Sequence, residues 1–339
     1  MLERREFLIR LGGLTAGILI PHISSQGIPQ NTRDKLGELL PLRKLGKTGE
    51  KVTMLGLGGY HIGWTTEKDA EGTIEAALEG GIRFFDTAEA YGPHISEERY
   101  GKFLTPKYRD ICFLMTKTLA KDSKTAKEHL EGSLKRLKTD YIDLWQAHAI
   151  ASKEDADTRL DQGVFEFMRE AKASGKVRYI GFTGHTNAQA HAYLIEKLGK
   201  DGMLDTVQMP VNPVDAAHSV SFVKQVIPAA ISNQYGVLAM KTLAGGQFFK
   251  EKYELEKKMW ETDNPVIPDH MNVKDAVNFV WSLPVSVLIS GASTPAMIRE
   301  KIQLAREEIK LDEKARLRLI EKVAEISREE KVEYYRNRG

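Results

Sequence analysis

The sequence predicts a (β/α)8 barrel, in which eight parallel strands close into a ring and helices cover its outside. Two observations support this prediction. From residue 42 onward, eight short apolar or β-branched runs alternate with amphipathic stretches of helical periodicity, a pattern typical of consecutive βα units. The chain has 339 residues, which is enough for one such barrel of about 250 residues.

The order of these runs gives the expected elements one by one. We expect strands at residues 52–58, 82–86, 111–117, 141–146, 177–182, 206–209, 236–241 and 285–290. Helical periodicity is clearest over residues 68–80, 124–138, 161–174, 187–198 and 295–307. A hairpin-like start over residues 42–52 is suited to plug the bottom of the barrel. The prediction is therefore a single barrel domain over residues 42–330, ending in a C-terminal helix.

An open, doubly wound sheet is the alternative fold, and it needs a glycine-rich phosphate-binding turn after an early strand. The segment that begins Gly56-Leu57-Gly58 resembles that turn, but His61 stands where the third glycine belongs. A tight turn that leaves a barrel strand close to a ligand explains these glycines better.

The first 26 residues have the layout of an export signal. Arg4-Arg5 is followed by Phe7-Leu8, then by a weakly apolar stretch that ends at Pro21. This resembles a twin-arginine signal peptide and is too short to span a bilayer as a mature helix. We therefore expect a signal peptide at residues 1–26, a polar linker at 27–41, and export machinery as a partner. The expected location is periplasmic, and the alternative is a cytoplasmic enzyme with an uncleaved tail.

Composition excludes several other classes of protein. The net charge is +2 and no basic block is present, so we expect no nucleic-acid partner. Cys112 is the sole cysteine and lies in an apolar run, which rules out an intrachain disulfide and predicts a buried core residue. The nine histidines show no metal-ligand spacing, and His185 and His191 are not one helical turn apart. We therefore expect no metal site.

Four polar residues follow three consecutive strands. Asp86 ends the second strand and Tyr91 lies in the next loop, while Lys117 and His148 stand at the ends of the third and fourth strands. In this fold the carboxyl ends of the strands carry the functional groups. An ammonium beside an apolar strand is costly unless it is paired, which makes Asp86 the expected partner of Lys117. A structural ion pair and a core histidine are the alternative, but four such groups at one rim favour catalysis.

The segments that carry these residues, FFDTAEAYG, MTKT and DLWQAH, resemble the signature segments of the aldo-keto reductase family. The resemblance implies reversible reduction of an aldehyde or ketone by hydride transfer from a nicotinamide cofactor. It implies that Tyr91 is the general acid and that Lys117 and Asp86 adjust the acidity of its hydroxyl group. His148 would orient the substrate carbonyl. A neighbouring ammonium favours the phenolate, so we expect the pKa of Tyr91 to be lowered.

The resemblance extends to the nicotinamide end of the cofactor site. Gln208 matches the glutamine that holds the nicotinamide amide, and Thr183 matches a serine of the family, whereas Gly184 replaces an asparagine. Met240 stands where an aromatic residue usually stacks on the nicotinamide. Lys241 and the following loop are expected to cover the pyrophosphate, through Leu243 and Gly245.

The adenosine end departs from the family pattern. Gly291 and Ala292 replace a lysine and a serine. Ser293 is expected at the start of a helix, where a phosphate can bind, and Arg299 or Lys301 is expected to supply charge. NADP(H) is the family's usual cofactor, and NAD(H) is the alternative.

Two other functions remain open at this stage. The same fold serves as a non-catalytic, NADP(H)-binding redox-sensing subunit, although the complete group of four residues favours the enzyme. A barrel hydrolase would need a pair of carboxylates at the rim, where only Asp86 and Glu89 are near. The expected partner is thus a small carbonyl substrate.

Overall fold

The computed structural model describes residues 32–199, 201–243, 270–307, 309, 311–328 and 332–337. The predicted signal peptide, the first five residues of the predicted linker and Gly245 lie outside the described residues.

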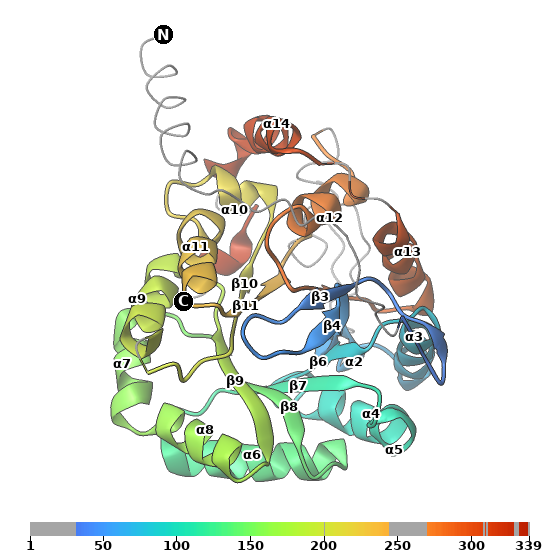
Figure 1. The fold of residues 1–339 in the computed structure, drawn as a ribbon, viewed down its shortest axis with the longest axis vertical. Coiled ribbons are helices and arrows are strands. Elements are labelled where there is room, and N and C mark those ends of the chain that lie inside the picture. Colours follow the sequence, from blue (N-terminus) through green and yellow to red (C-terminus); the bar gives the residue numbers. More distant parts are fainter. Residues whose placement is uncertain are drawn as a thin grey trace. The chain divides into compact units, whose positions relative to one another are not determined.

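Eight parallel strands close into a barrel in the order β10-β11-β12-β5-β6-β7-β8-β9, and Figure 1 looks along it. This confirms the predicted fold, and each of the eight expected strands supplies one strand of the barrel. Their bounds are β5 (Leu55–Gly58), β6 (Phe84–Asp86), β7 (Phe113–Thr118), β8 (Ile142–Ala147), β9 (Val177–Thr183), β10 (Thr206–Pro210), β11 (Gly236–Met240) and β12 (Val287–Gly291).

Helices surround the barrel, as the alternating pattern predicts. They are α2 (Gly59–Ile62), α3 (Glu67–Glu79), α4 (Ile95–Phe103), α5 (Thr105–Tyr108), α6 (Ser123–Leu137), α7 (Lys153–Asp161), α8 (Val164–Ala173), α9 (Ala188–Gly199), α10 (Pro213–Ala217), α11 (Ile227–Ser232), α12 (Val273–Trp281), α13 (Pro295–Arg306) and α14 (Glu313–Val323), with short turns η1 (Phe222–Val226), η4 (Ile326–Arg328) and η5 (Tyr334–Asn337).

The helix expected over residues 161–174 is present as α8, which begins three residues later than expected because the preceding helix, α7, ends only at Asp161. Gly163 lies between α7 and α8 with a φ of 76°, a left-handed conformation that glycine adopts without strain. The start of α7 is fixed by Ser152, whose side chain accepts a hydrogen bond from the Asp155 backbone N–H.

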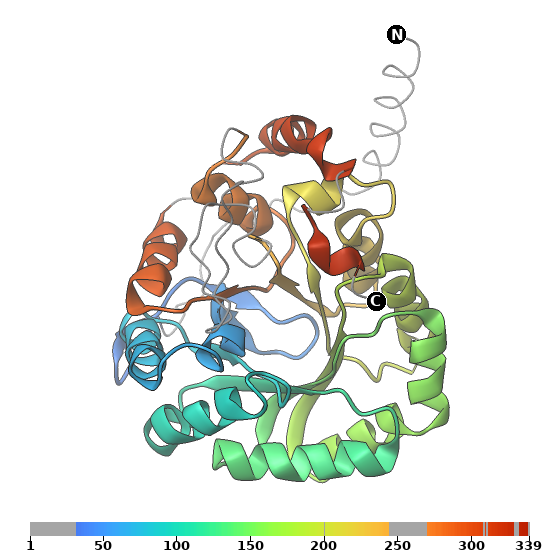
Figure 2. The same cartoon turned by 180° about the vertical axis from the view of Figure 1, so that it is seen from behind.

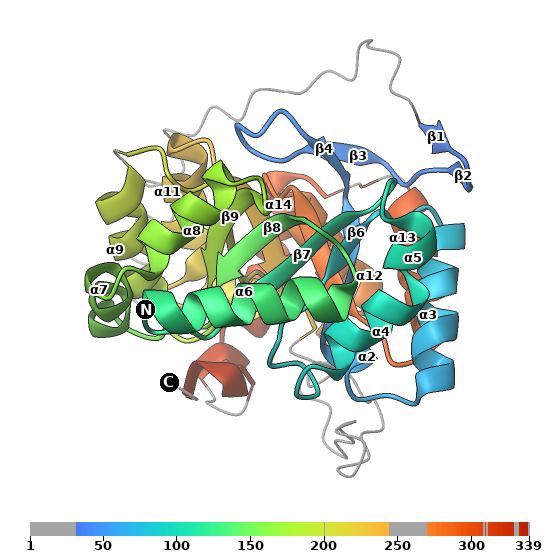
Figure 3. The same cartoon turned by 90° about the horizontal axis from the view of Figure 1, so that it is seen from below.

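The strand expected over residues 52–58 is also divided. Its first part, β4 (Lys51–Thr53), pairs antiparallel with β3 (Leu42–Lys44), and this hairpin lies at one end of the barrel (Figure 3). Leu45 and Val52 from the hairpin pack with Phe84 and Leu144 in a buried cluster. The predicted plug is therefore present, and it closes the end opposite the carboxyl ends of the strands.

Residues 32–41, which we assigned to the linker, pack on the barrel instead. They contain a small antiparallel hairpin of β1 (Arg33–Asp34) and β2 (Gly37–Glu38). The Asp34 carboxylate pairs with the buried Arg83 guanidinium at 2.5 Å, and Leu40 is buried. The polar composition of this segment concealed its packing, because its charged groups are satisfied by partners distant in the sequence.

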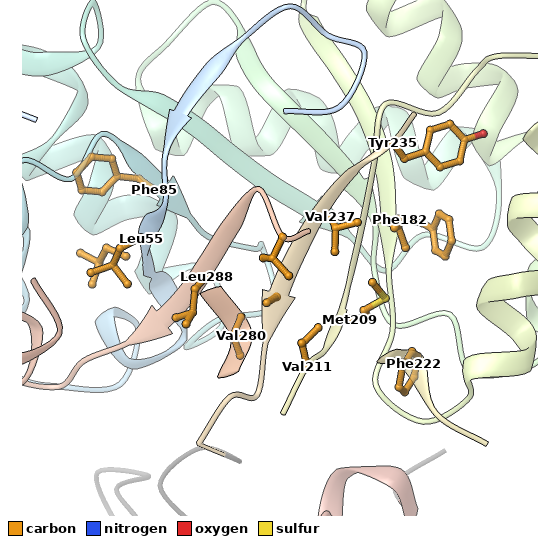
Figure 4. Packing of buried hydrophobic residues seen from close by; sticks show 14 of the residues in the cluster. Leu55, Phe85, Phe182, Met209, Val211, Phe222, Tyr235, Val237, Val280 and Leu288 are labelled. Atoms are coloured by element: carbon orange, nitrogen blue, oxygen red, sulfur yellow. The ribbon is translucent and has the colours of Figure 1, made fainter. Parts of the chain in front are cut away.

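The main hydrophobic core lies between the strands and the surrounding helices. Figure 4 shows some of its members, among them Phe85, Phe182 and Leu288 from different strands. Cys112 is buried, as expected, and burial raises the pKa of its thiol to about 12. Among the residues that the structure describes, no helix combines the length and apolar character needed to cross a membrane.

Candidate active site

The four residues predicted from the strand ends come together at the carboxyl end of the barrel. Asp86 is the last residue of β6, and Lys117 lies near the end of the adjacent β7. His148 follows β8, the next strand of the barrel. Tyr91 lies in the loop between β6 and α4, and its ring centroid is 5.7 Å from that of His148.

The Lys117 ammonium uses all three of its N–H donors. It pairs with the Asp86 carboxylate, donates to the Thr87 carbonyl at 2.7 Å and donates to the Tyr91 hydroxyl oxygen at 3.1 Å. The lysine side chain is completely buried. Because the Tyr91 oxygen accepts the bond from the ammonium, its own proton remains to be donated to another acceptor.

Burial opposes the charge on both partners of the ion pair. It raises the pKa of Asp86 and lowers the pKa of Lys117, while the opposite charge of each partner counters the shift of the other. A buried carboxylate is tolerated here because it has a charged, hydrogen-bonded neighbour.

The expectation that Lys117 lowers the pKa of Tyr91 is wrong in this structure. The residue as a whole is partly exposed, but protein surrounds its hydroxyl group, and this burial raises the pKa well above 10. The Asp86 charge raises it further, since it offsets the effect of the ammonium on the phenolate. Tyr91 is therefore a neutral hydrogen-bond donor.

His148 is neutral for related reasons. Its ring is buried, and burial together with the Lys117 charge lowers the imidazole pKa well below 6.5. The backbone around it is fixed, because its N–H donates to the Thr118 carbonyl at 2.8 Å and its carbonyl accepts from the buried Arg159 at 2.9 Å. The His148 Nδ1 atom is buried without a hydrogen-bond partner among the described residues.

Three residues predicted to contact the nicotinamide follow one another along the rim. Thr183 ends β9, Gln208 lies opposite it on β10, and Met240 ends β11. All three are buried, and the Thr183 hydroxyl lies 3.9 Å from the Met240 sulfur. The Gln208 Oε1 atom is buried with no partner in the described part of the chain, as expected of an acceptor that meets a bound amide.

The structure explains why Gly184 carries no side chain. A Cβ at this position would overlap the Ile150 carbonyl oxygen and the His191 ring, so the asparagine of the family does not fit. His185, which we had considered only as a metal ligand, lies beside His148 instead, with 6.3 Å between ring centroids. Its place two residues after the end of β9 is a signal that could have marked it as a site residue, and sequence reasoning missed it.

His61 is a second residue that sequence reasoning missed. A Cβ at Gly291 would overlap the His61 ring, so the glycine that replaces the family's lysine leaves room for this histidine. Burial, together with the charges of Lys241 and Lys301, lowers the pKa of His61 to about 4. Lys241 follows β11, and Lys301 lies on α13.

The other residues predicted for the adenosine end have separate surroundings. Ser293 is buried, and its carbonyl accepts from the Thr65 hydroxyl at 2.8 Å. Lys301 is also buried and donates to the Met297 carbonyl at 3.2 Å, whereas Arg299 is exposed. Leu243 is partly buried near the end of β11.

Glu89 holds the loop that carries Tyr91. Its carboxylate accepts from the Leu119 backbone N–H at 3.0 Å and lies 2.7 Å from the His129 ring. Burial raises the pKa of this carboxyl group to about 7. Glu89 therefore ties the loop to the end of β7.

Within the described ranges, no group of three or more potential metal ligands occurs.

Comparison with known proteins identifies the family. The model of the aldo/keto reductase family matches residues 54–331, and the chain belongs to this family. It is 34% identical over 223 residues to aldo-keto reductase YhdN from Bacillus subtilis, covering 60% of this chain and 62% of the relative. It is 30% identical over 222 residues to L-galactose dehydrogenase from Arabidopsis thaliana, and this alignment covers 61% of this chain and 66% of that relative. The alignments thus span less than two thirds of either relative.

The fold is also that of solved structures. The holo form of aldo-keto reductase AKR11C1 from Bacillus halodurans superposes with a TM-score of 0.69 and 22% sequence identity. The match covers 84% of this chain and 96% of that chain, which supports the barrel architecture described above.

The buried ion pair predicts the effect of removing one partner. Lys117→Met leaves the Asp86 carboxylate without its charged neighbour, so we expect the free energy of unfolding to fall by about 3–5 kcal/mol. The double variant Asp86→Asn/Lys117→Met removes that charge as well and should recover more than half of the loss. Denaturant unfolding measures both, and a single variant as stable as the wild type would contradict the account.

Proposed function

We propose that this protein is an NAD(P)(H)-dependent oxidoreductase that reversibly reduces an aldehyde or ketone to an alcohol. The observation that carries the proposal is the bonding at Tyr91. Its oxygen accepts from the Lys117 ammonium at 3.1 Å, which leaves the phenol proton for an acceptor at the mouth of the barrel. The neutral ring of His148 lies beside it.

The residues at the rim fit a nicotinamide cofactor. Gln208 Oε1 is a buried acceptor that meets no protein donor among the described residues, and an amide N–H₂ group supplies such a donor. Thr183 and Met240 flank it on the neighbouring strands. When bound, the cofactor supplies the hydride, and the protein positions the reactants and stabilises charge.

Tyr91 and His148 act on the carbonyl oxygen. In reduction, hydride addition at the carbonyl carbon places negative charge on this oxygen, and the Tyr91 Oη–H bond breaks as the proton moves to it. The His148 ring donates a hydrogen bond to the same oxygen. The phenolate left on Tyr91 is stabilised by the Lys117 ammonium, and in alcohol oxidation the proton returns to it.

Replacing the Tyr91 hydroxyl tests this role. We expect Tyr91→Phe to lower kcat about 100- to 10,000-fold for any carbonyl compound that the wild type reduces, with the dissociation constant for NADPH unchanged. Tyr60→Phe is the matched control, since its ring centroid is 5.5 Å from that of Tyr91, and it should retain most of the activity.

Two outcomes would count against the proposal. Equal turnover by Tyr91→Phe would remove this residue from the mechanism. A wild type that binds NADPH but reduces no member of a broad carbonyl panel would favour the non-catalytic, redox-sensing alternative.

We further propose that this protein discriminates only weakly between NADP(H) and NAD(H). The lysine and serine of the family's phosphate site are Gly291 and Ala292 here. Lys301 is bonded to a carbonyl of its own helix, and Arg299 is exposed. NADP(H) remains the expected cofactor, because it is the usual cofactor of the family.

Measured affinities test this proposal. We expect the dissociation constants for NADPH and NADH to differ by about tenfold or less, which corresponds to about 1.4 kcal/mol. Fluorescence titration of the reduced cofactors measures both without turnover. A thousandfold preference for NADPH would overturn the proposal and would require a dedicated phosphate ligand.

We also propose export through the twin-arginine pathway, a proposal that is supported by Arg4-Arg5 and the weakly apolar stretch after it. Changing both arginines to lysine should strand the full-length protein in the cytoplasm of a Gram-negative host. Immunoblots of periplasmic and cytoplasmic fractions measure this. A wild-type protein found only in the cytoplasm would contradict export.

A further inference from the structure

The C-terminal residues pack over the carboxyl end of the barrel. Residues 332–337 lie at the end opposite the β3–β4 hairpin (Figure 3), and Figure 2 shows the red segment with η5 across this face. The sequence of this segment is polar and charged, yet Val332, Glu333 and Tyr335 are each no more than 3% exposed. Such burial of charged groups requires specific partners.

Those partners come from the loop and helix after β10. One Glu333 oxygen accepts from the Asn212 amide at 3.2 Å and from the Tyr335 hydroxyl. The other lies 2.5 Å from the Arg336 Nε atom. Arg336 also pairs with Asp215, whose side chain is completely buried. Each of these charges is therefore matched, and the segment is held by the Asn212 hydrogen bond to Glu333 at one end and by the Arg336–Asp215 ion pair at the other.

This cluster reaches Lys241 at the end of β11. The Asn212 amide that donates to Glu333 also donates to the Lys241 carbonyl at 3.2 Å. The Lys241 ammonium lies 5.8 Å from the centroid of the Tyr335 ring, within the range of a cation–π interaction. Lys241 has a φ of 56°, a left-handed conformation that persists in a non-glycine residue only where its surroundings hold it.

Lys241 in turn lies among the histidines of the barrel mouth. Its charge contributes to the lowered pKa values of His61, His148 and His185. His61 packs on Gly291 at the adenosine side, and His148 lies beside Tyr91. Lys241 directly follows Met240, the last residue of β11, so it lies at the edge of the mouth where the pyrophosphate of a dinucleotide is expected.

We propose that residues 332–337 are a positioning segment for Lys241, with Tyr335 as its contact, and that the positioned ammonium binds the phosphate groups of the cofactor. This inference rests on the proposed function. Tyr335, Glu333 and Arg336 act through Lys241 and do not touch the reacting atoms. The sequence gives no sign of this role, because the contacts join residues 212, 241 and 335.

Cofactor affinity, measured without turnover, tests the proposal. Tyr335→Leu removes the ring under the ammonium, and we expect the dissociation constant for NADPH to rise roughly 3- to 30-fold. Tyr335→Phe keeps the ring and should restore most of the affinity. Tyr193→Leu is the matched control, because Tyr193 on α9 has Lys153 at 5.4 Å from its ring centroid, and it should leave the affinity unchanged.

A double-mutant cycle separates positioning from a general structural effect. Lys241→Met should weaken NADPH binding at least as much as Tyr335→Leu, and the double variant should be no weaker than Lys241→Met alone. Additive effects of the two substitutions would overturn the proposal. A variant that raises only the KM for the carbonyl substrate, with NADPH affinity intact, would also overturn it.

Thermal melts establish that each variant folds. If Tyr335→Leu does not fold, Arg336→Lys is the second variant. The shorter lysine side chain weakens the contacts of residue 336 with Glu333 and Asp215 and so loosens the same segment. This variant must also raise the NADPH dissociation constant. An unchanged dissociation constant would overturn this inference but not the proposed function. If the wild type does not bind NADPH, both the proposed function and this inference are overturned.

Discussion

The candidate site depends on one buried ammonium group. The three N–H donors of Lys117 fix the Asp86 side chain, the Thr87 carbonyl and the Tyr91 hydroxyl oxygen at once. Because an unmet donor or an unpaired charge is costly in the interior, the lysine determines how β6 and β7 and the loop after β6 are arranged. Glu89 adds a second tie between that loop and the end of β7. The phenol is thereby held in place with its proton available.

Around this group, the barrel mouth combines positive charge with neutral hydrogen-bonding rings. His61, His148 and His185 have lowered pKa values, because their rings are buried and lysines lie nearby. Lys117 serves the end where a carbonyl oxygen gains negative charge, and Lys241 serves the region expected for the phosphates. Each lysine has a defined neighbour: Lys117 pairs with the Asp86 carboxylate, and the Lys241 ammonium lies over the Tyr335 ring.

Much of the fold and the core of the site could be predicted from the sequence, because local runs determine where strands end. Asp86, Lys117 and His148 were placed at one rim in this way. The direction of the Tyr91 pKa shift could not be predicted, since it depends on burial and on the Asp86 charge in three dimensions. The exclusion of a side chain at Gly184 by Ile150 and His191, and the packing of His61 on Gly291, likewise join residues far apart in the chain.

The pH dependence of hydride transfer tests the central claim most directly. Single-turnover reduction of a carbonyl substrate by the NADPH-loaded protein reports proton donation at Tyr91, separated from product release. Because burial holds the phenol pKa above 10, the account predicts a rate that does not fall between about pH 6 and 9. A rate that falls through neutral pH, with a dependence that Tyr91→Phe abolishes, would show a phenol with a lowered pKa and would contradict the account.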